Sequence, residues 1–178
     1  MGRNVTCLLQ MISLSNGGED SRYWVWQPLP ESRFAEVAML ANVCWLEIRG
    51  KIRISVLSSA TRYGVYLVLK MIDAYGFNYH AAEVSVRTVG GVSFTKSVCL
   101  DPDIENRVIS SAVDSRNLVE MERPKERSDG WLEIELGEFS SLGQEDDELE
   151  MCLKEVEGGN WKSGLTVQGI EIRPKEDN

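Results

Sequence analysis

The chain has 178 residues, of which 43% are hydrophobic and 26% charged, and its formal net charge at pH 7 is −9. A chain of this length is normally one domain with enough interior to fold without disulfides or metal. The negative charge argues against nucleic acid and anionic membranes as partners, because both carry charge of the same sign. One histidine and four widely spaced cysteines give no zinc site of the usual spacing.

The N-terminal part predicts aromatic surface followed by a strand. Residues 22–52 hold three of the five tryptophans. Residues 31–40 are compatible with a short helical turn. Over residues 46–56 apolar and polar side chains alternate. This alternation predicts a strand with one face on a core and the other in water, as in antiparallel sheets.

The middle of the chain predicts a central strand, a hairpin and a loop. Residues 61–73 are apolar at both parities, which is typical of a strand covered on both faces. Residues 81–89 and 92–100, joined by Gly90-Gly91, predict a hairpin. Residues 101–129 are polar and contain two prolines, so we expect a long loop.

The C-terminal third alternates again, in residues 131–139, 148–156 and 165–174. The apolar phase of the last segment switches at Gly169, which predicts a β-bulge around Gln168 and Gly169. Many short strands with almost no helix predict an all-β fold. We expect one domain over residues 1–178, an antiparallel β-sandwich of jelly-roll type.

Targeting and redox signals are weak. We find no signal peptide and no apolar run near the roughly 20 residues of a membrane span. The start MGRNVT matches the patterns for myristoylation at Gly2 and glycosylation at Asn4, but both patterns often match by chance. The cysteines lie mostly in apolar or strand-like contexts, so we interpret them as reduced and the protein as intracellular. Their even number is also compatible with two disulfides.

Residues for catalysis are scarce. A nucleophilic triad needs a histidine, and His80 is alone in a tyrosine-rich loop. Carboxylates are plentiful, as in residues 143–150, and they leave a carboxylate-pair glycosidase open. A solvated acidic turn is the simpler interpretation of those residues. We therefore predict recognition without catalysis.

Residues for sugar binding are present. A sugar site needs an aromatic ring against the C–H face of a pyranose and a few fixed polar groups. Trp24 and Trp26 would face the same side of an extended segment, and Trp161 lies in a turn. We assign Trp45 and Trp131 to core or edge packing.

Five motifs follow one another in the chain: RYWVWQPLPESRF, EVAMLANVCWLEIRGKI, TRYGVYLVLKM, RSDGWLEIELGEF and ELEMCLKEVEGGNWKSGLTVQGIEIRP. Together they resemble the plant phloem protein 2 family with its Nictaba-like lectin domain, and the likeness runs from about Cys7 to Pro174. The resemblance implies a β-sandwich in the cytoplasm and nucleus that binds N-acetylglucosamine oligomers or N-glycan cores. Many relatives carry an F-box before this domain. We expect none here, because strand-like sequence begins almost at Met1.

The resemblance also implies sugar-site residues. A family tryptophan corresponds to Trp24, which we expect to lie open to solvent and to stack on a sugar ring. Two glutamates proposed to contact sugar correspond to Glu148 and Glu155. These glutamates differ by an odd number of positions, so a regular strand would aim them at opposite faces. An earlier tryptophan that lectin members usually carry is missing, because residues 15–18 are Ser-Asn-Gly-Gly.

Three functions therefore remain open. The favoured one is a lectin for N-acetylglucosamine-containing glycans or glycoproteins, without catalytic, metal or cofactor residues. The second is a protein-interaction domain with weakened or lost sugar binding, for which the missing tryptophan is the argument. A glycosidase is the third. The sequence leaves a homodimer open.

Overall fold

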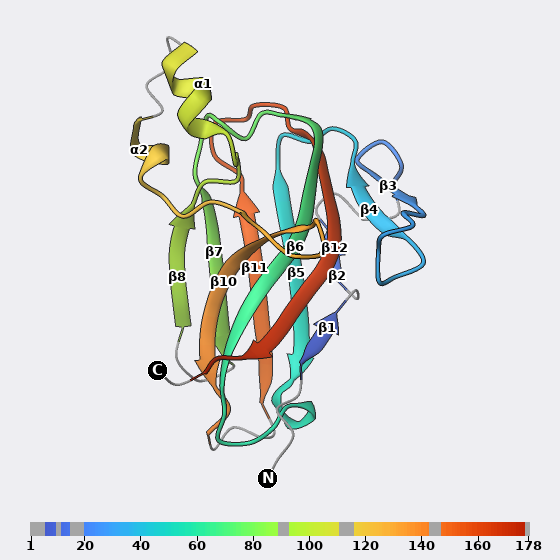
Figure 1. The fold of residues 1–178 in the computed structure, drawn as a ribbon, viewed down its shortest axis with the longest axis vertical. Coiled ribbons are helices and arrows are strands. Elements are labelled where there is room, and N and C mark those ends of the chain that lie inside the picture. The colour runs from blue at the N-terminus through green and yellow to red at the C-terminus, as the bar shows by residue number, and fades with distance from the viewer. Residues whose placement is uncertain are drawn as a thin grey trace.

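The computed structural model describes residues 6–9, 12–14, 20–88, 93–110, 116–142 and 147–176. Within these ranges the chain is mostly strands, which form two antiparallel sheets packed face to face (Figure 1). The predicted all-β sandwich of jelly-roll type is therefore confirmed.

The larger sheet is built around two long strands, β6 and β12. Its order is β3-β4-β12-β6-β10-β9, and β1 also pairs with β12. The strand bounds are β1 (Cys7–Leu9), β3 (Trp24–Gln27), β4 (Val37–Leu40), β6 (Arg62–Tyr75), β9 (Lys125–Glu126), β10 (Leu132–Ser140) and β12 (Ser163–Pro174). Residues 63–69 of β6 are buried at both parities, as predicted for a central strand. The register of β6 and β12 shifts between Val167 and Gly169, where the bulge is predicted.

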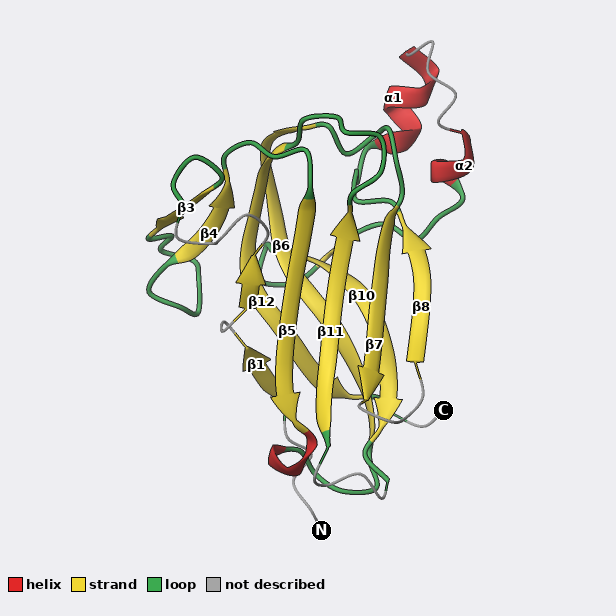
Figure 2. Cartoon of the chain, turned by 180° about the vertical axis from the view of Figure 1, so that it is seen from behind, coloured by secondary structure: helices red, strands yellow, loops and turns green. Residues whose placement is uncertain are grey.

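The smaller sheet has the order β2-β5-β11-β7-β8 (Figure 2). Its strands are β2 (Ile12–Leu14), β5 (Leu46–Arg53), β7 (Ala82–Thr88), β8 (Ser93–Val98) and β11 (Glu148–Glu155). Strands β7 and β8 pair in antiparallel fashion, which confirms the hairpin, although its Gly90-Gly91 turn lies outside the described residues. Odd-numbered residues of β11 face the core and even-numbered ones face outward.

Three segments differ from the prediction. Residues 32–35 form bends before β4, without a helix. The strand predicted for residues 46–56 ends at Arg53, and a 3-10 turn, η1 (Ile54–Val56), follows it with Ile54 buried in the core.

The predicted loop 101–129 holds two short helices and a strand, α1 (Ile104–Ser110), α2 (Arg116–Val119) and β9. Ile104 and Leu118 pack with Cys99 in a small separate core, which gives these helices their anchor. Ile104 and Leu118 lie far apart in the sequence, so their spacing does not show the apolar periodicity by which a helix is recognised. None of the helices in the described ranges is long and apolar enough to span a membrane.

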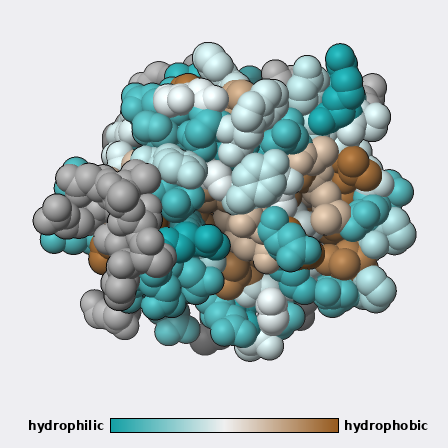
Figure 3. Space-filling view, turned by 90° about the horizontal axis from the view of Figure 1, so that it is seen from above, coloured by the Kyte–Doolittle hydropathy of each residue, from teal (hydrophilic) through white to brown (hydrophobic). Residues whose placement is uncertain are grey.

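Several connections meet at one end of the sandwich, which we call the loop end. They are residues 41–45 between β4 and β5, residues 76–81 between β6 and β7, and residues 156–162 between β11 and β12 (Figures 1 and 2). Helix α1 lies at the same end. Seen from above, hydrophobic residues gather in its middle and toward the side of β3 and β4, between polar ones (Figure 3).

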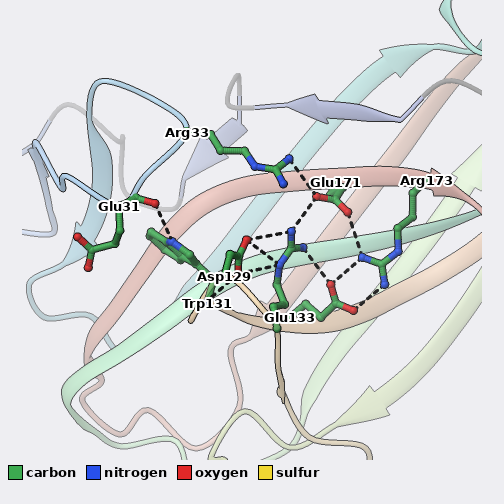
Figure 4. Close-up of polar contacts among 8 residues, drawn as sticks. Glu31, Arg33, Asp129, Trp131, Glu133, Glu171 and Arg173 are labelled. Atoms are coloured by element: carbon green, nitrogen blue, oxygen red, sulfur yellow. Dashed lines mark hydrogen bonds and ion pairs between the residues drawn. The ribbon is translucent and has the colours of Figure 1, made fainter.

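The outer face of the larger sheet is tied together by ion pairs (Figure 4). Arg127 and Arg173 both bind Glu133 and Glu171, at nitrogen-to-oxygen distances of 2.6 to 3.1 Å. Arg173 also lies over the ring of Tyr66, 3.7 Å from its centroid. A network with little exposure and shared partners contributes more to stability than isolated surface pairs do.

We predict that Glu133→Gln makes stability less dependent on pH. Hydrogen bonds from Arg173 hold the pKa of Glu133 below its usual value of 4.5. A lowered pKa in the folded state contributes stability above pH 4.5, and this contribution is lost as the pH falls through the folded-state pKa. Urea midpoints should therefore differ most between wild type and variant at pH 7 and converge toward pH 3. A constant difference would contradict the pairing.

Candidate functional site

Trp24 is buried in the core, with 1% of its surface exposed. It lies on β3 opposite Leu40 of β4, and it packs into the main core cluster. Trp26 packs on the same cluster, so the predicted shared side is correct, but that side faces inward. The expectation that Trp24 lies open to solvent is wrong, because the outward position of this strand belongs to Val25.

Glu148 and Glu155 lie at opposite ends of β11. At roughly 3.4 Å per residue their Cα atoms are about 24 Å apart. Glu148 is exposed and pairs in register with Arg53 of β5, away from the loop end. Glu155 is at the loop end but faces the core. The three residues predicted from the sequence are therefore not brought together into one site.

Glu155 forms a buried ion pair with Lys162, whose side chain is fully covered. The Lys162 ammonium also donates to the main-chain oxygens of Cys44 and Asn160, each at 3.0 Å. Burial lowers the pKa of Lys162. The carboxylate predicted to contact sugar is thus the counter-charge of an interior lysine.

Two tryptophans are exposed at the loop end. Trp45 is 55% exposed and Trp161 56% exposed. The assignment of Trp45 to packing is wrong, because Trp45 lies in a bend just before β5 and its side chain is exposed. Trp161 is open as its turn context suggested, and Trp131 is buried as expected, with its indole N–H donating to the oxygen of Glu31 (Figure 4).

Contacts between the connections bring the two tryptophans to the same region. Val43 and Lys162 form a main-chain bridge, and each is close in sequence to one of them. Gly76 has φ of +91°, and a Cβ there would lie 2.0 Å from the Trp161 main-chain oxygen, so the neighbouring connection passes directly beside Trp161. Tyr75, also exposed, donates from its hydroxyl to Asn42.

A pocket of about 260 Å³ opens beside Tyr75. Its polar lining comes from Asp73, Asn78, Asp101, Asp103 and Arg107. Asp101 is held by Arg107, with 2.7 Å between Oδ2 and Nε. Aromatic surface next to a polar hollow suits a ligand with an apolar face and several hydroxyl groups.

The other polar features of the described residues are less suited to bind a ligand. A smaller hollow of about 220 Å³ on the outer face of the smaller sheet has no aromatic lining, and its basic side chains are matched by glutamates. In the described part of the chain no group of three or more histidine, cysteine or acidic side chains is placed to hold a metal ion. Cys44, Cys99 and Cys152 carry free thiols.

We predict that Trp24→Ala costs stability, in contrast to Trp161→Ala. Truncating a buried tryptophan should lower the free energy of unfolding by about 3–5 kcal/mol. Removing an exposed indole should change it by about 0.5 kcal/mol or less. Urea denaturation of both variants measures the difference. Equal stability of Trp24→Ala and wild type would contradict the burial of Trp24.

Comparison with known proteins places the chain in a family. The family model described as phloem protein 2 matches residues 7–174. F-box protein PP2-B10 from Arabidopsis thaliana is 46% identical to this chain in an alignment that covers 88% of it. F-box protein PP2-B1 from the same plant is 40% identical, and the alignment covers 90% of the chain. The chain spans only 55% and 60% of their lengths.

Among solved structures, a family 35 carbohydrate-binding module from Clostridium thermocellum is similar over 96% of this chain and 98% of its own, with a TM-score of 0.47 and 7% identity. The match of the family model over nearly the whole sequence identifies the family. The chain belongs to the phloem protein 2 family.

Proposed function

We propose that the chain is a non-catalytic domain that binds N-acetylglucosamine-containing glycans at its loop end. The observation that carries this proposal is the pair of exposed indoles, Trp45 and Trp161, at the same end as the polar pocket. Gly76, which lines this pocket, lies against the main chain of Trp161. The family supports a lectin role, since the sequence resembles a Nictaba-like domain.

Physical chemistry favours stacking at this place. An exposed indole offers a flat apolar face, and an N-acetylglucosamine ring has an apolar C–H face of similar size. Large aromatic side chains left open near one another commonly mark a binding site. The polar groups of the pocket would orient the hydroxyl and amide groups of a neighbouring sugar unit.

A protein-interaction role is the second candidate. Its support is that relatives at 40–46% identity are named F-box proteins and are longer than this chain. In such a longer protein, this domain would recognise a partner protein, and the F-box would be a separate part of the chain. Exposed Val25 and Ile72 on the larger sheet add apolar surface that a protein partner would cover.

Calorimetric titration with chitotriose separates these functions. We expect wild type to bind weakly, and Trp45→Ala and Trp161→Ala each to lose about one to two decades of affinity, if a stacked sugar contributes the roughly 1–3 kcal/mol found for stacked bases. Leu142→Ala is the matched control, because Leu142 is 67% exposed at the opposite end.

Two outcomes would contradict the proposal. If the folded wild type gives no heat of binding at millimolar chitotriose, the glycan-binding function is refuted and the protein-interaction role is favoured. Loss of affinity in Glu148→Gln, with both tryptophan variants unaffected, would instead support the glutamate predicted from the sequence.

A further inference from the structure

The Lys162 ammonium holds the two chain segments that carry the exposed tryptophans. It donates to the oxygen of Cys44, the residue before Trp45, and to the oxygen of Asn160, the residue before Trp161. Its third contact is the carboxylate of Glu155 at the end of β11. A lysine ammonium has three N–H donors, and three acceptors surround this one.

Main-chain hydrogen bonds reinforce the same junction. The Val43 N–H donates to the Lys162 oxygen at 3.0 Å, and the Lys162 N–H donates to the Val43 oxygen at 2.7 Å. Asn160 in turn donates from its amide to the Gly76 oxygen at 2.7 Å. Through these bonds the connections 41–45, 76–81 and 156–162 form one linked unit.

A lysine is an expensive residue for simple packing. Removing an ammonium from water is unfavourable, and apolar residues of similar volume often replace a buried ion pair without loss of stability. Glu155 gains little beyond this pair, since its Oε1 accepts no hydrogen bond from a described residue. An apolar residue at 162 could fill the space but could not hold two carbonyl groups.

We propose that Lys162 and Glu155 are positioning residues of the glycan site. The ammonium fixes the main chain ahead of Trp45 and Trp161, and Glu155 keeps the ammonium charged and in place. This inference rests on the proposed function. It assigns Glu155 an effect on glycan affinity that acts through Lys162, without contact between its carboxylate and the sugar.

The test is a double variant, Lys162→Met with Glu155→Leu, which removes both charges and keeps apolar volume. We expect it to remain folded, with chitotriose affinity at least tenfold weaker and the emission of Trp45 and Trp161 more accessible to acrylamide. The matched control is Lys154→Met with Glu83→Leu. This lysine–glutamate pair also uses a residue of β11, is exposed, has 3.1 Å between its charged atoms, and should leave affinity unchanged.

The outcomes separate this inference from the proposed function. If wild type binds chitotriose and the folded double variant binds equally well, the positioning role is overturned. If wild type does not bind, the proposed function fails instead. Should the double variant not fold, Lys162→Gln with Glu155→Gln keeps polar atoms in the same space. That variant must also bind at least tenfold more weakly than wild type, and equal affinity would overturn the inference.

Discussion

One buried charge organises the end of the molecule that carries its open aromatic surface. The Lys162 ammonium is sealed from solvent, and its cost of burial is offset only because Glu155 and two main-chain oxygens surround it. Removing any of these acceptors leaves a donor without a partner in the interior. The connections that bear Trp45 and Trp161 are therefore fixed by the same interaction that completes the core.

The sheets leave few other places for recognition. The outer face of the larger sheet is occupied by ion pairs among Arg127, Arg173, Glu133 and Glu171, and Trp131 lies covered beneath Lys70. On the smaller sheet, lysine and arginine side chains pair with glutamates. Most charges are thus satisfied within the chain, although its net charge is −9. Open aromatic surface is concentrated where the strands end.

Local patterns predicted most of the fold. Period-two alternation gave the strands, Gly90-Gly91 indicated the hairpin, and the phase change at Gly169 gave the bulge. Alternation also placed Glu148 and Glu155 on opposite faces. Each of these features depends on residues that are close together in the sequence, so it can be predicted from the sequence alone.

The site depended on contacts that no local pattern carries. Alternation puts Trp24 and Trp26 on one side, but only the pairing of β3 with β4 over the core decides that this side faces inward. Lys162 meets Cys44 across 118 positions of sequence. A lysine in a turn ordinarily points to water, and nothing near it in the sequence announces a buried pair or an exposed Trp45.

Glycan binding at the loop end is tested most directly by NMR, by recording the indole N–H signals of the five tryptophans during titration with chitotriose. Signals can be assigned from single Trp→Phe variants. If the glycan binds at the loop end, the signals of Trp45 and Trp161 shift on titration while those of the buried Trp24 and Trp131 stay in place. A shift of the Trp24 signal, with those of Trp45 and Trp161 unmoved, would contradict the account.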